Sequence, residues 1–288
     1  MLRSFPVFVV SRFFIVAGLL LLALHTSARA ETTTSNKNSE PLTFGFLPII
    51  STQKLVARFA PLADYLAKEL DKPVKLESAP NFAEFRQRTK KGRYDIIFTA
   101  PHFYYLAQRE NNYRVLVRVN APSMRAIIVA PKDGQVKTLS DLKGKKLSIL
   151  DPLALGTVLV RSHLIQNGIN PDKDLILVNT PTHNASLLSA YNHATDAASL
   201  MVPPFKRART EVKNAMRVID KTDGTPHMPI AVSSRVSEKD AQKIQTVLVN
   251  LKNTDEGRAL LKHLSWPGFV VATPDEYDSV KWAAEQIK

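Results

Sequence analysis

The chain has 288 residues and a formal net charge of +13, and it contains no cysteine. The lack of cysteine excludes disulfides, thiolate metal sites and cysteine nucleophiles. A basic surface suits nucleic acid, anionic lipid or an anionic solute. The sequence has no arginine-rich tract with interleaved aromatic residues of the kind that strand-binding proteins use, so nucleic acid is not an expected partner.

The first thirty residues have the pattern of a secretory signal peptide. Arg3 and Arg12 precede an apolar run over residues 13–24, and Ala28–Ala30 offers an A-x-A cleavage site. We therefore predict a protein exported from the cytoplasm, with a signal peptide at residues 1–30 and a flexible leader at residues 31–40. The alternative is an uncleaved membrane anchor, although the apolar run is short for a bilayer.

Strand and helix patterns then alternate. "LTFGFL" at Leu42–Leu47 indicates a strand, and the apolar spacing over Thr52–Leu70 predicts a helix that Pro61 should kink or divide. "VKLES" indicates a second strand, and Asn81 and Glu84 open the next helix in the pattern of a capping box.

The stretch "YDIIFTAPHFYYLA" indicates a buried strand at residues 96–98 that runs into a helix, with Pro101 at its first position. "YRVLVRVN" and "RAIIVAP" follow as strands. Repeated strand and helix units predict a mostly parallel sheet.

The same alternation restarts after residue 131. "LSDLKGKKLSIL", "DLILVN" and "AASLMV" contain strands, and "GTVLVRSHLIQNGI", "NASLLSAYNHA" and "PPFKRARTEVKN" read as helices. Three terminal helices are predicted over residues 237–251, 256–264 and 274–287. We expect two α/β lobes, at residues 41–124 with 231–288 and at residues 125–230, joined by two crossovers and with the ligand cleft between them.

Catalytic and metal motifs are missing. There is no G-x-S-x-G, no P-loop and no H-E-x-x-H, and the six histidines beyond residue 30 lack metal-ligand spacing. We therefore expect no catalytic residue, no metal, no cofactor and no enzymatic activity. An extracytoplasmic enzyme is the alternative, and it would need a nucleophile or metal set that converges in the cleft.

Strand-to-helix junctions are the candidate site. They lie at residues 48–52, 99–102, 151–157, 180–184 and 201–204. In an α/β lobe such junctions stand at the carboxyl ends of the strands, where ligands bind, and helix N-termini there form an anion site. The alternative is that they are compact connections only, as in any α/β protein.

The chain resembles the PhnD-type periplasmic binding proteins, the phosphate, phosphite and phosphonate receptors of ABC importers. The resemblance runs from about residue 42 to residue 268 and rests on six phrases in order: "GFLPI", "FAPLADYLAKEL", "YDIIFTAPHFYYLA", "LSDLKGKKLSILDP", "HLIQNGINPDKDL" and "HNASLLSAYNHATDAA". It implies the type II periplasmic binding protein fold, which closes on its ligand like a hinge.

Seven residues are the predicted ligand contacts: Thr99, His102, Tyr104, Arg125, Thr157, His183 and Asn184. The resemblance matches Tyr104 to the family's tyrosine in the helix after glycine-proline and His183 to its histidine at the start of a second-lobe helix. Thr157 is the remaining hydroxyl of the family's oxyanion turn. His102 and Arg125 can add donors or charge.

The oxyanion turn departs from the family. It reads "DPLALGT", with Leu153, Ala154 and Leu155 where hydroxyls are expected. Each hydroxyl donor to a charged group contributes roughly 1.5–3 kcal/mol, so their loss weakens phosphate-type binding unless other donors replace them. We interpret the site as one for a phosphonate-like anion or for a less charged, more apolar one. Its walls would be Phe46, Leu47, Ile49, Leu153, Leu155 and Met201, unless these side chains face the core.

These observations predict an exported, monomeric solute-binding protein that delivers a small anion to an ABC permease by cleft closure. The alternative is a sensory protein that presents its closed form to a membrane sensor kinase or chemoreceptor.

Overall fold

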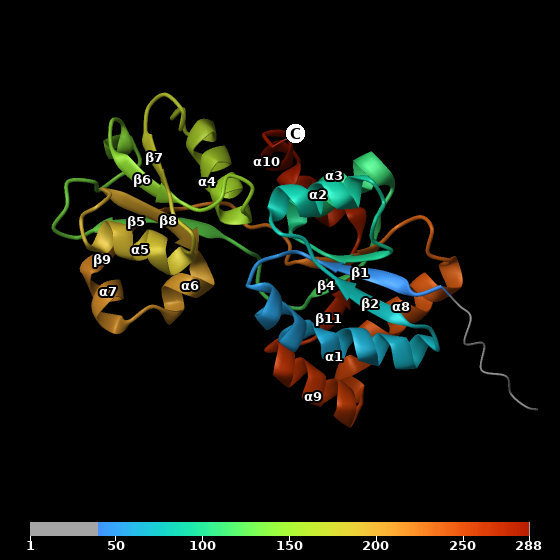
Figure 1. Ribbon diagram of the computed structural model, residues 1–288. Helices are drawn as coiled ribbons and strands as arrows, with labels where there is room; N and C mark the ends of the chain where they lie inside the picture. The colour runs from blue at the N-terminus through green and yellow to red at the C-terminus, as the bar shows by residue number, and fades with distance from the viewer. Residues whose placement is uncertain (1–39, 288) are drawn as a thin grey trace, which may run out of the picture. The chain divides into compact units, whose positions relative to one another are not determined.

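The structure, a computed structural model, describes residues 40–287. The predicted signal peptide and almost all of the predicted leader therefore lie outside the described residues. The strands of the described part form two sheets, each with helices on both of its faces (Figure 1).

The first sheet has six strands in the order β11-β4-β10-β3-β1-β2. β1 pairs in parallel with β2 and β3, whereas β10 pairs antiparallel with β3 and β4, and β11 pairs antiparallel with β4. The bounds are β1 Leu42–Phe46, β2 Val74–Glu77, β3 Ile96–Phe98, β4 Arg114–Val119, β10 Pro229–Val232 and β11 Phe269–Val271.

Helices cover both faces of this sheet (Figure 1). One face packs against α1 (Thr52–Leu70), α8 (Glu238–Asn250) and α9 (Asp255–Leu264), with the 3-10 turn η2 (Leu251–Asn253) between the last two. The other face carries α2 (Phe82–Lys90), α3 (Pro101–Asn111), the 3-10 helix η3 (Pro274–Val280) and α10 (Lys281–Glu285).

The second sheet has five strands in the order β7-β6-β8-β5-β9. The bounds are β5 Ala126–Pro131, β6 Lys146–Ile149, β7 Ile176–Asn179, β8 Ala197–Met201 and β9 Met216–Lys221. α4 (Leu155–Gln166) packs on one face, and α5 (His183–Tyr191), α6 (Val202–Arg207) and α7 (Thr210–Ala215) lie on the other (Figure 1). The short η1 (Ser140–Leu142) precedes β6.

The expectation of mostly parallel sheets is wrong, because both sheets are mixed. β6 pairs in parallel with β7 and β8, but β5 pairs antiparallel with β8 and β9. The strands that follow the crossovers, β5 and β10, enter their sheets against the direction of the neighbouring parallel strands. The predicted single helix in "PPFKRARTEVKN" is also divided, because Ala208 has an extended backbone (φ −64°, ψ 157°) between α6 and α7.

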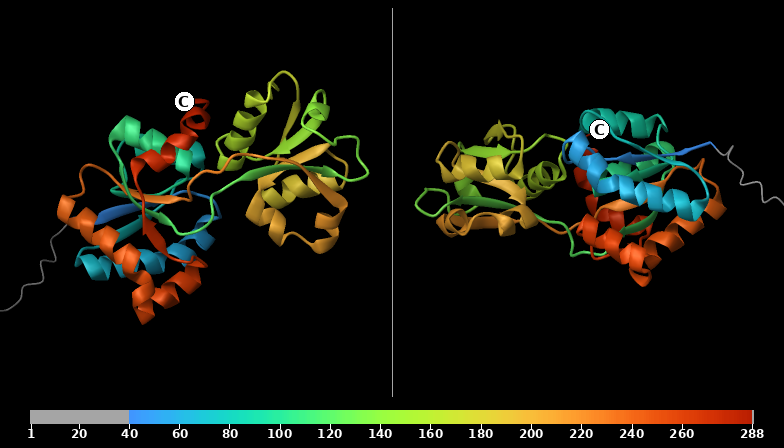
Figure 2. Two further views of the ribbon diagram at one scale, coloured as in Figure 1. Left: turned by 180° about the vertical axis from the view of Figure 1, so that it is seen from behind. Right: turned by 60° about the horizontal axis from the view of Figure 1, so that its bottom comes forward.

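Two chain segments connect the sheets (Figure 2). They pair with each other at Met124 and Thr225, where each backbone N–H donates to the other residue's carbonyl at 2.8 and 3.0 Å. Met124 and Thr225 lie within the segments that the sequence predicts as crossovers, near residues 122–127 and 224–230. Pro229 and Ile230 already belong to β10 of the six-stranded sheet.

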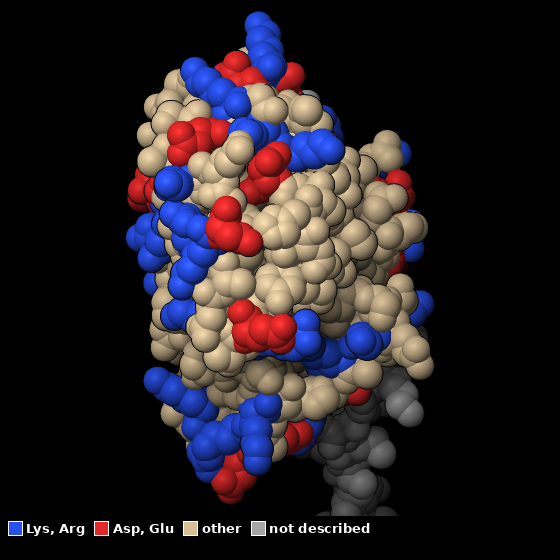
Figure 3. All heavy atoms as spheres, turned by 90° about the vertical axis from the view of Figure 1, so that its left-hand side faces the viewer, with Lys and Arg blue, Asp and Glu red and all other residues tan. Residues whose placement is uncertain are grey.

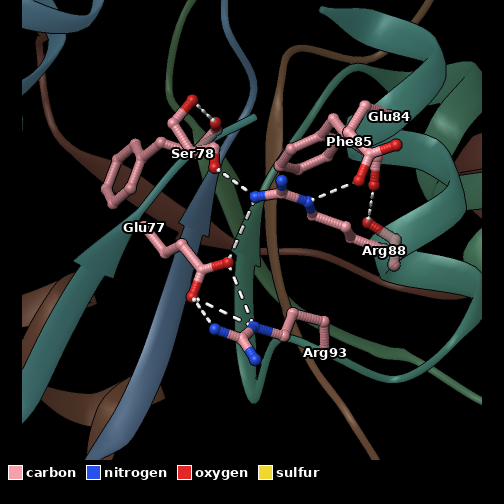
Figure 4. A network of polar contacts seen from close by, with 8 residues as sticks. Glu77, Ser78, Glu84, Phe85, Arg88 and Arg93 are labelled. Atoms are coloured by element: carbon pink, nitrogen blue, oxygen red, sulfur yellow. Dashed lines mark hydrogen bonds and ion pairs between the residues drawn. The ribbon is translucent and has the colours of Figure 1, made fainter. Parts of the chain in front are cut away.

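A polar network fastens α2 to the edge strand β2 (Figure 4). Arg88 bonds to Glu84 at 2.8 Å and to the carbonyl of Ser78 at 3.0 Å, and Arg93 binds the Glu77 carboxylate with two nitrogens. Asn81 caps α2 as expected, since its side chain accepts from the N–H of Glu84 at 2.8 Å. The Glu84 carboxylate pairs with Arg88, so it lies in this network.

Pro61 does not divide α1, which is continuous from Thr52 to Leu70. A proline has no N–H to donate to the carbonyl four residues earlier, which here belongs to Ala57. His263 of α9 supplies the missing donor, with its Nε2 at 3.1 Å from the Ala57 oxygen. A side chain of α9 thus replaces the backbone donor that Pro61 lacks.

We predict that His263→Ala lowers the free energy of unfolding by about 1 kcal/mol, the typical net value of one hydrogen bond. In a Pro61→Ala background the same change should cost much less, because the substituted residue has a backbone N–H that can donate to the Ala57 carbonyl. Urea unfolding of the four proteins of this double-mutant cycle measures the difference. If His263→Ala lowers the free energy of unfolding equally in both backgrounds, His263 does not replace the donor that Pro61 lacks.

Candidate functional site

Among the described helices of at least eight residues, three start without a side-chain cap. These are α1, α3 and α4, whose N-cap residues Ser51, Ala100 and Ala154 accept no hydrogen bond from the first turn through their side chains. The other described helices of at least eight residues, α2, α5, α8 and α9, are capped by the side chains of Asn81, Thr182, Ser237 and Thr254.

The first turn of a helix contains N–H groups without a partner inside the helix, and these carry partial positive charge. α1, α3 and α4 follow β1, β3 and β6, and β1 and β3 are parallel neighbours. The uncapped turns therefore stand at the carboxyl ends of parallel strands, where the arrangement suits an anion.

The junction of β3 and α3 contains two buried polar atoms without a hydrogen-bond partner. Thr99 and His102 are both fully buried, and Thr99 Oγ1 and His102 Nδ1 are the unpaired atoms. The other ring nitrogen of His102, Nε2, lies 3.0 Å from the carbonyl oxygen of Leu153, in the turn that leads into α4. Burial lowers the pKa of His102 to about 4, so the ring is neutral at neutral pH.

The turn before α4 is built from its own polar groups. Asp151 accepts from the N–H of Leu153 with Oδ1 at 2.8 Å, and its carbonyl accepts from the N–H of Ala154 at 2.9 Å. Thr157 is fully buried, and its hydroxyl accepts from the N–H of Leu150 at 3.2 Å. The Thr157 hydroxyl thus closes the connection between β6 and α4.

His183, Gly156 and Met201 converge at the carboxyl ends of β6 and β8. A β-carbon on Gly156 would lie 3.4 Å from Met201 Sδ and 3.7 Å from His183 Cε1. The Nδ1 atom of His183 accepts from the N–H of Met201 at 3.4 Å, so the ring proton is on Nε2. Burial, and then the charge of Arg207, lower the pKa of His183 to about 4.

Tyr104, Arg125 and Asn184 have other surroundings. Tyr104 is fully buried, its hydroxyl accepts from the N–H of Val115 at 3.3 Å, and burial raises its pKa to about 12. These contacts give it a packing role in the first sheet. Arg125 donates to the carbonyl of Thr222 at 3.0 Å beside the crossover, and Asn184 is exposed on α5.

Of the predicted apolar wall residues, Ile49 is exposed, at 43%, and the others lie in or against the cores of the two sheets. Phe46 and Leu47 are buried in the first core, and Leu155 and Met201 are buried in the second. Leu153 is different, because it precedes α4 but packs against the core of the first sheet. Together with the bond from His102, this contact joins the β3–α3 junction to the α4 turn.

A buried serine cluster was missed by the sequence reasoning. Ser148 Oγ lies 3.0 Å from Ser186 Oγ, and Ser186 Oγ donates to the carbonyl of Ser199 at 2.9 Å. The cluster fastens α5 to β6 and β8 and so fixes His183, three residues before Ser186. Small polar residues inside otherwise apolar strand patterns were the available signal.

Other possible sites do not involve the predicted residues. The surface hollows lined by residues 138–143 with 167–169 and by residues 81–91 contain none of the seven. Within residues 40–287, no group of three or more His, Asp or Glu side chains could hold a metal ion, and no helix is long and apolar enough to cross a bilayer. Lys and Arg side chains are spread among Asp and Glu on the face drawn in Figure 3.

We predict that stability falls as the pH decreases from about 6.5 to about 4. Burial lowers the pKa values of His102, His183 and His227 from 6.5 to about 4, so the unfolded chain binds more protons in this window. Urea unfolding at pH 7, 6 and 5 measures the slope, and His227→Gln should reduce it. A free energy of unfolding that is constant between pH 7 and pH 5 contradicts this prediction.

Comparisons with known proteins agree with this architecture. The profile of a family described as "ABC transporter, phosphonate, periplasmic substrate-binding protein" matches residues 44–277. The phosphonates-binding periplasmic protein of Escherichia coli K12 is 24% identical over 248 residues, 82% of this chain and 73% of that protein. The phosphate-import protein PhnD of Mycolicibacterium smegmatis is 23% identical over 294 residues, 92% of this chain and 91% of that protein.

Solved structures share the fold. PhnD1 from Prochlorococcus marinus, in complex with methylphosphonate, superimposes with a TM-score of 0.73 at 16% identity, over 86% of this chain and 98% of that chain. The fold is the type II periplasmic binding protein fold, as expected. Members of the matched family bind small ligands and interact with ABC transporter permeases, and the family is not one of enzymes. The chain belongs to the periplasmic substrate-binding proteins of phosphonate ABC transporters.

Proposed function

We propose that this protein binds a small oxyanion of the phosphonate, phosphite and phosphate class in the periplasm and delivers it, without chemical change, to an ABC permease. The uncapped first turns of α1, α3 and α4 carry this proposal. A helix start that lacks a side-chain cap keeps its N–H groups available for a ligand.

The contacts of the β3–α3 junction support a shared site. α1 and α3 begin at the same edge of the first sheet, because β1 and β3 are parallel neighbours. The bond from His102 to Leu153 brings the start of α3 to the turn that leads into α4. Thr99, His102, Gly156 and His183 are the proposed ligand contacts, and Tyr104 and Thr157 support them from behind.

The proposed contacts are neutral. His102 and His183 are uncharged at neutral pH because burial lowers the pKa of each ring to about 4. Backbone N–H groups and neutral side chains therefore stabilise the ligand, as helix N-termini do for phosphate and sulfate elsewhere. This donor set favours a singly charged oxyanion over a more highly charged one.

We expect purified protein to bind at least one of phosphate, phosphite, methylphosphonate and 2-aminoethylphosphonate with a dissociation constant in the micromolar range or below. Isothermal titration calorimetry at pH 6 to 7 measures it. Dimethyl sulfone, an uncharged compound of similar shape, is the control and should give no heat of binding. The proposed function is contradicted if dimethyl sulfone gives a saturable heat of binding, or if none of the four oxyanions gives one.

Ala154→Ser tests the use of the α4 start. The introduced hydroxyl would accept a hydrogen bond from the first-turn N–H groups, and this bond should raise the free energy of unfolding by about 1 kcal/mol. The same bond competes with the ligand, so oxyanion affinity should fall severalfold in calorimetric titration.

Ser237→Ala is the matched control, because it removes the cap of the distant helix α8. It should lower stability by about 1 kcal/mol and leave affinity unchanged. If Ala154→Ser stabilises the protein without weakening binding, the first turn of α4 does not hold the ligand.

A further inference from the structure

The hydrogen bond of His102 fixes which of its ring atoms carries the proton. A neutral imidazole has one N–H donor and one bare acceptor nitrogen. The carbonyl oxygen of Leu153 can only accept, so the proton lies on Nε2, 3.0 Å away. Nδ1 is therefore an acceptor with a free lone pair.

This acceptor is buried and has no partner. His102 is 0% exposed, and its Nδ1 makes no hydrogen bond. A buried polar atom that is left unpaired is costly in free energy, so a ligand that pairs it gains affinity. Protonation of Nδ1 could turn it into a donor, but burial lowers the pKa of the ring to about 4. At neutral pH the ligand must itself bring the proton for this bond.

Thr99 supplies the complementary donor at the same junction. It is 0% exposed, its Oγ1 also lacks a partner, and its backbone N–H is already bonded to the carbonyl of Pro229 at 3.2 Å. A hydroxyl can donate to an ionised oxygen. The uncapped first turn of α3 adds backbone N–H donors beside it. The junction thus offers several donors and one acceptor.

We propose that this junction recognises a proton of a singly charged, protonated oxyanion: the ligand's O–H donates to His102 Nδ1, while its ionised oxygen accepts from Thr99 Oγ1 and the first turn of α3. The inference rests on the proposed function and names the ligand species more closely. Monoanions of phosphonates, phosphite and phosphate carry such an O–H. Sulfonates have the same shape and charge but no proton to donate, so they leave Nδ1 unpaired.

The experiment compares methylphosphonate with methanesulfonate by calorimetric titration at pH 6, where each carries predominantly one negative charge. The two probes differ chiefly in the hydroxyl proton. We expect methylphosphonate to bind at least tenfold more tightly, because methanesulfonate places an ionised oxygen against a lone pair. The measured quantity is the ratio of the two dissociation constants.

Variants at three positions separate proton recognition from general support of the site. In His102→Phe the ratio should fall to near one, and in His102→Gln, which keeps an acceptor, it should stay above one. Thr99→Val should weaken the binding of both probes. His183→Ala is the control, because it removes a donor of the second sheet and should weaken both probes by the same factor. Thermal unfolding identifies any variant that fails to fold.

The outcomes are distinct. A ratio of ten or more that collapses in His102→Phe supports the inference. Equal binding of both probes, or tighter binding of methanesulfonate, overturns it and leaves the proposed function standing. A large ratio that persists in His102→Phe also overturns it, because the discrimination then comes from another residue. If neither probe binds, the inference is overturned. If none of the oxyanions tested for the proposed function binds either, the proposed function is overturned as well.

Discussion

The N–H groups of a helix start need partners, and this requirement organises the candidate site. A side-chain cap contributes roughly 0.5–2 kcal/mol to a helix, and the protein uses such caps on α2, α5, α8 and α9. It leaves them out at α1, α3 and α4. The stability that these three turns lack is what an anion can supply on binding.

The fold could be predicted from the sequence where the pattern is local. The apolar runs of β1, β3, β6 and β8 and the amphipathic spacing of α1 and α8 each show in their own residues. The direction of the strands could not be predicted, because β10 and β5 take their pairing from segments far away in the chain. The continuity of α1 is similar, since the donor that compensates for Pro61 lies in α9.

The candidate site, like the fold, could be predicted only where the sequence pattern is local. Thr99, His102 and His183 follow from the strand-to-helix junctions and the family phrases. Two features of the site could not be predicted from residue types, because they depend on the path of the backbone. Ala154 is an N-cap without a side-chain bond, and the Leu153 carbonyl pairs with His102. Tyr104 fits the family pattern, and the sequence did not indicate that its hydroxyl accepts from the N–H of Val115 in β4.

The position of β10 has a consequence for the order in which the protein can fold. This strand lies between β3 and β4, although residues 120–228 separate it from β4 in the sequence. A chain that emerges from its N-terminus first presents β1, β2 and β3 long before the strand that links them to β4 and β11. β3 and β4 are therefore joined only when residues 229–232 arrive, and β11, at residues 269–271, is the last strand to complete the six-stranded sheet. Such dependence on contacts between distant parts of the chain slows folding.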